Sequence, residues 1–444
     1  MPKIAFVSEH ASPLAAPGSV DCGGQNVYVA HLALQLAQMG YAIDIFTRRE
    51  STTQKDIVRW RDNIRVIHVT AGPPQYIPKE KLLPHMPAFA DAVIDFARNQ
   101  EARYELVHAN FFMSGLVAQR IKRELGIPYV ITFHALGLVR RLSQGAADGF
   151  PPERIAIERE LMRDADRIIA ECPQDRLDME RHYGAARSRI DIVPCGFDPH
   201  ELRPMRGQAR ARLGLRADEF VVLQLGRMVP RKGVDNVIES LAVLRDTHGV
   251  HARLLVVGGH APDGRLQDCP ELARLMALAA SLGLEQQVDF VGQKARHELG
   301  RYYSAANVFV TTPWYEPFGI TPLEAMACAT PVIGAAVGGI KTTVLEGVTG
   351  YLVPPKNPQA LADRLALLHA DPAHARRLGE AGCRRAHQFY TWRSVASRVA
   401  ALYESVIDET VASIAAAAAT RLPVVVQGGA LQNFNPNFNS LRET

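Results

Sequence analysis

Two acidic residues, Glu316 and Glu324, stand eight positions apart around a turn that contains a glycine. The pattern predicts that a helix begins here, with Thr321 as its N-cap, Pro322 at its first position and Glu324 three residues after the cap. The first turn of a helix has uncommitted backbone N–H groups, which bind anions. Carboxylates beside that turn can accept hydrogen bonds from sugar or ribose hydroxyls. The segment therefore favours a ligand with both phosphate and hydroxyl groups.

A structural interpretation is open for one of the two acids. Glu324 could be the reciprocal partner of Thr321 in a capping box, which would stabilise the helix start by about 1 kcal/mol. Glu316 lies in an apolar segment, residues 314–318, in which a carboxylate needs a partner. Glu316 therefore carries the sharper functional hypothesis.

A basic loop offers groups for binding a diphosphate. The strand-like residues 220–225 are followed by Gly226–Gly233, in which Arg227 and Lys232 flank the connection to a helix. Each cation can contribute about 1.5–3 kcal/mol through charge-assisted hydrogen bonds to a phosphate. A solvated surface loop is the alternative, and we assign Arg231 to it.

Two further candidates follow strand-like segments in the N-terminal half. Gly23 and Gly24 precede a helical pattern, and paired glycines let the backbone approach a phosphate closely. The segment lacks G-x-G-x-x-G, so it is not a dinucleotide fingerprint. His134 comes directly after the strand-like residues 129–132. We expect it to be structural unless other elements converge on the same cleft.

Short apolar runs alternate with helical patterns over nearly the whole chain, and this alternation is the main evidence for the fold class. It predicts an α/β protein with doubly wound parallel sheets, whose ligands bind at the carboxyl ends of the strands. The expected strands are residues 4–7, 43–46, 66–69, 106–108, 129–132, 167–170 and 190–193, and then 220–225, 254–257, 288–290, 308–310, 331–333 and 351–353.

The length of 444 residues predicts two domains of roughly 200 residues each. Residues 196–215, which are rich in Pro, Gly and Arg, interrupt the alternation, so we expect one domain over residues 1–200 and a second over 201–388. A helix over residues 392–407 closes the compact part. Residues 410–444 have no periodicity to anchor them, and we expect a partly disordered tail.

Composition excludes several classes of protein. A formal charge of +4 with 22% charged residues is too balanced to indicate nucleic acid or an acidic membrane as partner. No apolar run reaches the ~18 residues of a membrane span, and no export leader is evident, so a cytoplasmic protein is expected. The cysteines form no C-x-x-C pair, which predicts neither a zinc site nor disulfides, only reduced and mostly buried thiols: Cys22, Cys172, Cys195, Cys269, Cys328 and Cys383.

Together these motifs resemble the retaining glycosyltransferases of family 4, which have the GT-B fold of two Rossmann-like domains facing across a cleft. The resemblance covers residues 3–407 and is most specific in residues 316–353, which include Gly338 and Gly339. The N-terminal half looks most similar to the sucrose-phosphate synthase, sucrose synthase and mycothiol glycosyltransferase branch, in residues 21–29, 46–48, 78–79 and 154–159.

The resemblance implies a donor site in the second domain, an acceptor site in the first, and a C-terminal helix, residues 389–409, that crosses back to the first. Glu316 would bind the donor hexose and Glu324 the ribose. Arg227 and Lys232 would bind the diphosphate, and with Glu316 and His134 they form the implied catalytic set. Further donor contacts would come from Gly23, Gly24, Gln293, Lys294, Phe318, Gly319, Ile320, Thr321 and Leu323.

On the acceptor side the resemblance implies Asn110, Phe111 and His134 as lining residues. Lys79 and Arg154 would hold a phosphate of the acceptor, since two cations suit a dianion. Phe111 stands where the mycothiol enzymes have a tyrosine, and Ala135 where the branch has Ser or Thr. A neutral sugar or polyol is therefore the alternative acceptor.

The implied activity is retaining transfer of a hexosyl group from a nucleotide diphosphate sugar, with UDP favoured, to a small soluble sugar, sugar phosphate or polyol. The family needs no metal and no other cofactor. A GDP-mannose-dependent mannosyltransferase of polysaccharide or glycolipid synthesis is the alternative with the same machinery. From other classes, a UDP-sugar 2-epimerase or a non-catalytic nucleotide-sugar sensor could share the architecture. An NAD oxidoreductase is disfavoured because G-x-G-x-x-G is absent.

Overall fold

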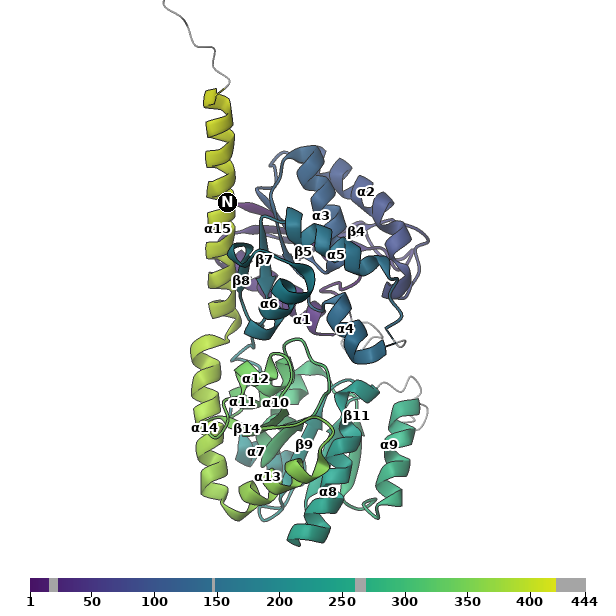
Figure 1. Cartoon of the computed structure of the whole chain (residues 1–444), viewed down its shortest axis with the longest axis vertical. Helices are drawn as coiled ribbons and strands as arrows, with labels where there is room; N and C mark the ends of the chain where they lie inside the picture. The colour runs from purple at the N-terminus through teal and green to yellow at the C-terminus, as the bar shows by residue number, and fades with distance from the viewer. Residues whose placement is uncertain (16–22, 146–147, 260–268, 421–444) are drawn as a thin grey trace, which may run out of the picture.

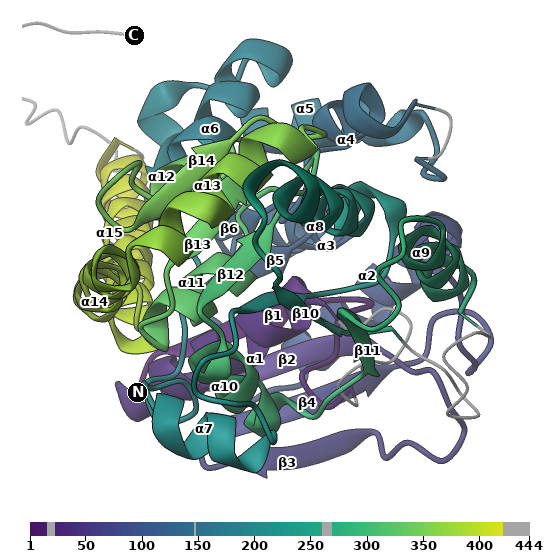
Figure 2. The same ribbon diagram turned by 90° about the horizontal axis from the view of Figure 1, so that it is seen from below.

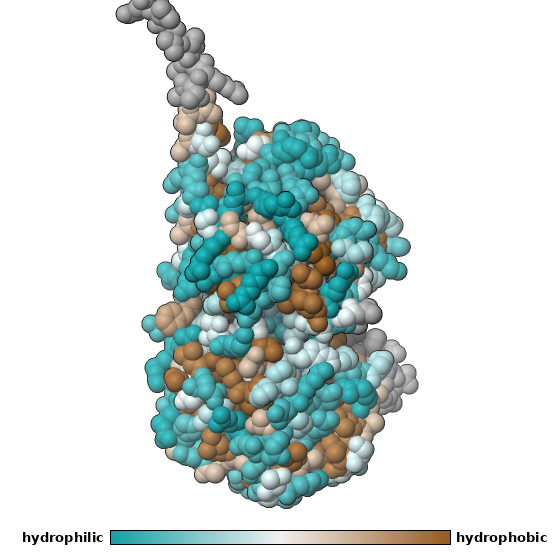
Figure 3. Space-filling model, viewed as in Figure 1, coloured by the Kyte–Doolittle hydropathy of each residue, from teal (hydrophilic) through white to brown (hydrophobic). Residues whose placement is uncertain are grey.

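A computed structural model describes residues 1–15, 23–145, 148–259 and 269–420 and places them in two α/β domains, one above the other (Figure 1). Each domain is built around a sheet of mainly parallel strands with helices on both faces, which confirms the predicted fold class (Figure 2). On the surface the domains form two lobes, and hydrophilic side chains cover much of the visible face (Figure 3). Residues 16–22, including Asp21 and Cys22, lie outside the described ranges.

The sheet of the N-terminal domain has the strand order β3-β4-β2-β1-β5-β6-β7-β8. Its strands pair in parallel, except that β3 is antiparallel to β4. The order reverses between β1 and β5, so the connections after these strands diverge and leave a crevice for a ligand. The strands are β1 (Lys3–Val7), β2 (Ala42–Arg48), β3 (Ile57–Arg61), β4 (Ile64–Val69), β5 (Leu106–Asn110), β6 (Tyr129–Thr132), β7 (Arg167–Ala170) and β8 (Ile190–Ile192).

The sheet of the C-terminal domain has the order β11-β10-β9-β12-β13-β14, and all its strands are parallel. Here the order reverses between β9 and β12, so a second crevice lies at the carboxyl ends of these two strands. The strands are β9 (Val221–Leu225), β10 (Arg253–Val257), β11 (Val288–Gly292), β12 (Val308–Thr311), β13 (Val332–Ala335) and β14 (Gly350–Val353).

All thirteen expected strands are present within two residues of their predicted ends, and in the described ranges one further strand was missed. The missed strand, β3, lies at the edge of its sheet and has alternating exposed and half-buried residues. Its sequence, Ile-Val-Arg-Trp-Arg, has no buried apolar run, which was the signal used for the others.

The helices pack on both faces of each sheet and bury the apolar cores. One face of the N-terminal sheet is covered by α1 and α15, the other by α2 and α3. In the C-terminal domain α8, α9 and α13 cover one face, and α10 and α11 the other. The helices are α1 (Gly24–Gln38), α2 (Met86–Arg98), α3 (Phe112–Leu125), α4 (Gly137–Gln144), α5 (Glu153–Asp164), α6 (Pro173–Asp178), α7 (Arg206–Arg212), α8 (Val234–His248), α9 (Pro270–Ser281), α10 (Arg296–Ala305), α11 (Ile320–Ala327), α12 (Ile340–Thr343), α13 (Pro358–Ala370), α14 (Pro372–Phe389) and α15 (Trp392–Thr420).

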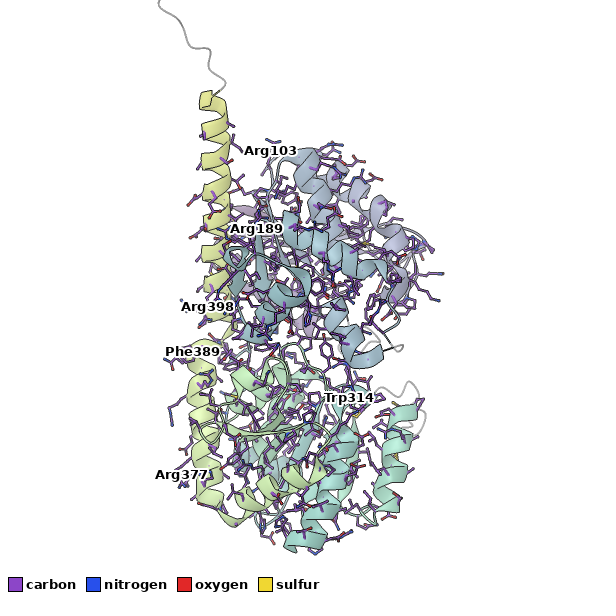
Figure 4. All side chains as sticks on the ribbon, viewed as in Figure 1. Arg103, Arg189, Trp314, Arg377, Phe389 and Arg398 are labelled. Carbon is purple, nitrogen blue, oxygen red and sulfur yellow. The ribbon has the colours of Figure 1, made fainter. Side chains whose placement is uncertain are left out.

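The segments around Phe197 and around Tyr390 connect the two domains, and backbone hydrogen bonds join them. Phe197 N donates to Tyr390 O at 2.9 Å, and Trp392 N donates to Phe197 O at 3.1 Å. The Trp392 ring then stacks on His31 of α1, with 5.4 Å between the ring centroids. Figure 4 shows Phe389, at the end of α14, on the side of the molecule where α15 begins. The linker and the C-terminal crossing therefore form one connecting structure.

Helix α15 is longer than predicted. Its buried residues recur at helical spacing from Trp392 to Val406 and pack against the N-terminal domain. The helix continues to Thr420 and extends past that domain (Figure 1). Residues 411–417 are therefore helical, where partial disorder was expected, but they are exposed, as expected for a segment that nothing anchors. Residues 421–444 lie outside the described ranges. Among the described helices none combines the length and the apolar character of a membrane span.

Candidate active site between the two domains

The loops that follow β9 and β12 border the crevice of the C-terminal domain, and close backbone contacts join them. Trp314 N donates to Arg231 O at 3.1 Å, and Thr312 Oγ1 donates to Gly233 O at 2.8 Å. A Cβ at Gly233 would lie 2.1 Å from Thr312 O, so this approach requires a glycine. Figure 4 shows Trp314 at the end of the domain that faces α4 of the other domain.

Glu316 and Lys232 form an ion pair between these two loops. Lys232 Nζ donates to Glu316 Oε2, and Arg231 Nη1 lies 3.6 Å from the same oxygen. Both side chains of the pair are only 14% exposed. Arg231 is also largely buried, so its assignment to the solvated surface is wrong. The structure thus brings two predicted site residues into direct contact and adds a third charged group.

Burial and charge act on this pair in different ways. Burial raises the pKa of Glu316, but the charges of Lys232 and Arg231 lower it by more, so its pKa falls below the ordinary value and the carboxylate is ionised at neutral pH. Burial lowers the pKa of Lys232, and the charge of Glu316 opposes that effect only in part. A phosphate that displaced Glu316 from Lys232 would supply the same stabilising negative charge.

The remaining predicted groups of this domain lie at the carboxyl ends of the same sheet. Arg227 is exposed, and its charge lowers the pKa of both Lys232 and Glu316, which places it within Coulombic reach of the pair. Gln293 and Lys294 follow β11, the edge strand two positions from β9. The structure thus brings these two residues to the same end of the sheet as the ion pair.

Helix α11 begins earlier than the sequence indicated. Its N-cap is Gly319, in the left-handed region at φ 87°, and Ile320 is its first residue. The prediction that Thr321 is the N-cap and Pro322 the first helical residue is therefore wrong. The first turn still follows directly on the loop that carries Glu316, and its N–H groups have no partner within the helix.

Gly338 and Gly339 explain the path of the loop before α11. A Cβ at Gly338 would lie 1.7 Å from Glu316 O, and one at Gly339 would lie 2.5 Å from Phe318 O. Gly339 N also donates to Pro317 O at 2.9 Å. The loop is thus held by close packing on a second, distant glycine pair, which a local capping pattern does not reveal.

Glu324 is held by two side chains of α10 rather than by a helix cap. Tyr303 Oη donates to its Oε2 at 2.8 Å, and Arg296 Nη1 lies 3.1 Å from its Oε1. The capping-box interpretation is therefore wrong. Arg296 also donates to Glu201 of the linker at 3.0 Å. The sequence reasoning missed Arg296, although it stands two positions after Lys294 in the turn assigned to the donor base.

The start of α1 faces the start of α11 across the domain boundary. Gly23 is the N-cap of α1, and Gly24 is its first residue. The Cδ1 atom of Ile320 lies 3.4 Å from the place that a Cβ of Gly24 would occupy. Two helix N-termini, one from each domain, therefore approach the same interdomain space, where their partial positive charges favour an anion.

His134 lies at the end of β6 in a strained conformation. Its φ of 59° is rare for a residue other than glycine, and such strain is concentrated at functional sites. Its Nδ1 lies 3.2 Å from Glu171 Oε1, and its Nε2 lies 3.1 Å from Asn110 Oδ1. The imidazole is thus fixed from both edges, by the last residue of β5 and by the residue that follows β7. Glu171 was missed, and its position directly after a predicted strand was the available signal.

Glu171 also connects His134 to the loop of the other domain. The next residue, Cys172, donates from Sγ to Pro317 O at 3.5 Å, and Pro317 is adjacent to Glu316. The end of β7 therefore touches the loop that carries Glu316. His134 and Glu316, predicted from separate halves of the sequence, border the same interdomain space.

Arg154 is enclosed by aromatic rings on the N-terminal side. Its Cζ lies 4.7, 4.8 and 4.5 Å from the ring centroids of Phe111, Phe112 and Phe150. Its Nε donates to Glu158 Oε1 at 2.7 Å, and the side chain is only 2% exposed. Its Nη1 is buried and has no hydrogen-bond partner within the described part of the chain. A buried guanidinium N–H without a partner is a site for a further acceptor oxygen.

Of the other predicted acceptor residues, Phe111 contacts Arg154 directly, and Lys79 lies in a separate segment. Phe111 has the left-handed φ of 92° at the start of α3, which is strained for an aromatic residue. Lys79 begins the short 3-10 helix η1 (Lys79–Lys81), and its Nζ lies 3.5 Å from Glu80 Oε1. Burial raises the pKa of Tyr315, next to Glu316, and the charge of Arg154 opposes that effect, so Arg154 is near the donor-side loop.

The arrangement combines three kinds of group around one interdomain space: cations, helix N-termini, and carboxylates with an imidazole. Cations and helix N-termini stabilise a diphosphate and the charge that it gains as a leaving group. Ionised carboxylates accept hydrogen bonds from sugar hydroxyls. The geometry is therefore suited to positioning a phosphorylated sugar compound and to stabilising charge on its phosphate.

Comparisons with known proteins identify related families for both domains. The model of the family described as Glycosyltransferase Family 4 matches residues 22–201, and that described as Glycosyl transferases group 1 matches residues 205–385. A D-inositol 3-phosphate glycosyltransferase of Kineococcus radiotolerans is 37% identical over 424 residues, 92% of this chain and 97% of the relative. The protein of that name from Corynebacterium glutamicum is 34% identical over 91% of this chain and 97% of its own.

Solved structures match over the same extent. The sucrose-phosphate synthase from Thermosynechococcus elongatus has a TM-score of 0.84 and 35% identity, and the match covers 92% of this chain and 100% of that chain. The Anabaena protein Alr3699/HepE, solved in complex with UDP and glucose, has a TM-score of 0.72 at 21% identity, covering 91% and 100%. The second likeness concerns the fold alone.

Proposed function

Because the chain belongs to the family 4 glycosyltransferases, we propose that it transfers a hexosyl group from a UDP-sugar to a phosphorylated sugar or polyol, with retention of configuration. The observation that carries the donor half is the ion pair of Glu316 with Lys232 beside the start of α11, opposite Gly24. A nucleotide diphosphate sugar has a diphosphate for the cations and helix N-termini and hydroxyls for the carboxylates.

We assign one donor contact to each of these residues. Lys232 and Arg227 bind the diphosphate, and Glu316, released from Lys232, accepts hydrogen bonds from the hexose. Glu324 accepts from the ribose hydroxyls while Arg296 and Tyr303 hold its carboxylate in place. Gln293 and Lys294 border the base. Uridine is the base that the likeness to the sucrose-phosphate synthase and mycothiol branch favours.

The reaction needs no covalent intermediate with the protein. The bond between the anomeric carbon and the diphosphate oxygen breaks, and the acceptor oxygen forms its bond to that carbon on the same face. The proton of the acceptor hydroxyl passes to the departing phosphate oxygen. Lys232 and Arg227 stabilise the charge that develops on that oxygen, which is the role we assign to them in place of a metal ion. His134, fixed by Glu171 and Asn110, lines the sugar pocket near the reacting carbon.

A phosphorylated acceptor is supported by the names of the relatives and by one feature of this chain. The relatives act, by their names, on D-inositol 3-phosphate or make sucrose phosphate. In this chain the buried Nη1 of Arg154 has no partner within the described ranges, and a phosphate oxygen would give it one. Lys79 supplies the second cation.

Base selectivity tests the donor half of the proposal. We expect the protein, incubated without acceptor, to release free nucleotide slowly from UDP-glucose and more slowly from ADP-glucose, GDP-glucose and GDP-mannose. Nucleotide release is measured by ion-exchange chromatography with the protein omitted as control. Preferential release of GDP from GDP-mannose would favour the mannosyltransferase alternative, and formation of an epimer without transfer would contradict the proposal.

The variant Arg154→Lys tests the acceptor phosphate. Lysine retains the charge beside Glu158 but lacks the planar fork, so we expect the KM for D-inositol 3-phosphate to rise about 10- to 100-fold, the effect of losing one charge-assisted hydrogen bond. Initial rates at saturating donor measure it. The KM of an unphosphorylated polyol should not change. An unchanged KM for the phosphorylated acceptor would contradict the assignment.

A further inference from the structure

A cavity of about 250 Å³ lies where both domains meet the C-terminal crossing. Its walls come from the ends of β7 and β8 in the N-terminal domain, from the loop before α11 and from α12 in the C-terminal domain, and from α14 and α15. Figure 4 shows two of its residues, Phe389 and Arg398, at the boundary between the domains. We call it the junction cavity.

Aromatic and aliphatic side chains form much of the wall of the junction cavity. Three aromatic rings lie close together there: the ring centroids of Phe318 and Phe389 are 6.5 and 6.4 Å from that of Tyr390. Aromatic rings pack favourably against a further flat ring. An apolar cavity of about 150 Å³ can hold benzene, so the junction cavity has room for a ring with a short substituent.

Two arginines of the lining have no acidic partner within the described ranges. Arg385 Nε donates to Thr343 O at 3.3 Å, and its Nη2 donates to Thr342 O at 3.0 Å and to Tyr390 Oη at 3.2 Å. All these partners are neutral, so the charge of this half-buried guanidinium is not balanced. Arg398 is exposed on α15 and forms no ion pair with the described residues. Such a pair of cations favours an oxyanion, which can accept charge-assisted hydrogen bonds from both.

The junction cavity also reaches groups that position the candidate active site. Glu171 lines it, and Oε1 of Glu171 lies 3.2 Å from His134 Nδ1. Phe318 lines it as well and belongs to the loop that carries Glu316. Glu171 is the one acid of the lining within the described part of the chain, so the two arginines give the lining a net positive charge.

We propose that the junction cavity binds a small aromatic carboxylate. Its ring packs against the aromatic lining, and its oxygens accept hydrogen bonds from Arg385 and Arg398. A neutral ring lacks the anion that these arginines require, and a small hydrated anion leaves the aromatic wall without a partner. The ligand is therefore defined by both features together.

A ligand in the junction cavity acts on the donor site from a distance. It contacts both domains and the crossing, so it stabilises the arrangement seen here, in which Glu316 is paired with Lys232. On the proposed function, the diphosphate of the donor separates that pair. Because a ligand shifts an equilibrium towards the arrangement that it binds better, the aromatic carboxylate weakens donor binding. This effect rests on the proposed function, whereas the binding itself does not.

Binding is tested with benzoate and phenylacetate as probes, by saturation-transfer NMR and calorimetry on the full chain. We expect millimolar dissociation constants, the range for ligands of this size. Benzyl alcohol has the ring without the charge, and acetate has the charge without the ring. Each should bind at least ~10-fold more weakly than benzoate, because each lacks one of the two kinds of contact.

Arg398→Gln removes one cation from the junction cavity and breaks no described hydrogen bond. We expect the Kd of benzoate to rise about 10-fold, the effect of losing one charge-assisted hydrogen bond. Arg393→Gln, at an exposed position of the same helix outside the cavity, is the matched control and should bind benzoate like the wild type. Equal affinity in Arg398→Gln and wild type, or no binding of either carboxylate to the wild type, would overturn the inference.

Donor kinetics test the effect on the active site. Benzoate should raise the KM for UDP-glucose about 5-fold, a typical coupling between two sites, and the KM should reach a plateau once the junction cavity is saturated. Acetate at the same ionic strength is the control. A KM that rises without limit, equally in Arg398→Gln, would show binding at the donor site and would overturn the inference. Failure of the wild-type protein to release nucleotide from UDP-glucose would instead contradict the proposed function.

Discussion

Replacing Glu316 by glutamine should lower the turnover of UDP-glucose by at least ~100-fold, the scale on which a preorganised electrostatic group contributes to a transition state. The carboxylate is 14% exposed and ionised, and it is paired with Lys232. Glutamine has nearly the same shape but no charge, so it can neither orient Lys232 nor accept two strong hydrogen bonds from the hexose.

Single-turnover and steady-state kinetics measure this loss, and the melting temperature reports whether the variant is folded. Glu285→Gln, at an exposed position of the same domain, is the matched control and should be indistinguishable from the wild type. The affinity for UDP, which has no hexose, should change much less than kcat. Wild-type turnover in a folded Glu316→Gln protein would remove Glu316 from the mechanism.

The second large effect is expected for Lys232→Ala, which should also lower kcat by at least ~100-fold because it removes the buried cation to which we assign the leaving diphosphate. Lys232 is buried and its charge is poorly solvated, which lowers its pKa. A poorly solvated charge interacts strongly with a phosphate. The loss should appear in the affinity for UDP as well, since the diphosphate is part of both ligands.

Arg216→Ala removes an equally large cation from the exposed surface of the same domain and should have no effect on rate. Glu316 and Lys232 are in contact, so the double variant should lose less than the product of the two single losses. Multiplicative losses, or a kcat for Lys232→Ala close to that of the wild type, would show that the two residues do not act as one unit.

The sequence was sufficient for those features that depend on regular patterns. Apolar runs alternating with helical patterns predicted thirteen strands. Because ligands of such sheets bind at the carboxyl ends of the strands, residues 227, 232 and 316 were expected together at that edge of one sheet. The rule worked because the strand order reverses between β9 and β12, the strands that precede these residues. His134 followed from the same rule in the other domain.

Features that depend on packing between distant segments could not be predicted. The start of α11 is set by Gly338 and Gly339, which fix the preceding loop, and so Thr321 does not serve as the cap despite a suitable local pattern. Glu324 bonds to Tyr303 and Arg296 of another helix, where a capping box was expected. Both predictions were wrong because they used a local capping pattern, whereas contacts with distant segments determine the helix start and the partners of Glu324.

The burial of charged side chains could not be predicted from the sequence either. Arg231 and Arg154 belong to runs that are typical of solvated surfaces, yet one is part of the Glu316 ion pair and the other is enclosed by three phenylalanine rings. Glu171 belongs to no motif. It directly follows the end of β7, and its contact with His134 depends on the position of β7 beside β6.

The central claim, retaining transfer from a UDP-sugar at the Glu316 and Lys232 site, is tested most directly by the anomer of the first product. Proton NMR can follow hydrolysis of UDP-glucose, whose glucosyl group is α-linked, before the released glucose equilibrates between anomers. The account predicts that α-glucose appears first and that Glu316→Gln and Lys232→Ala abolish its appearance. Initial release of β-glucose, or release at an unchanged rate in both variants, would contradict it.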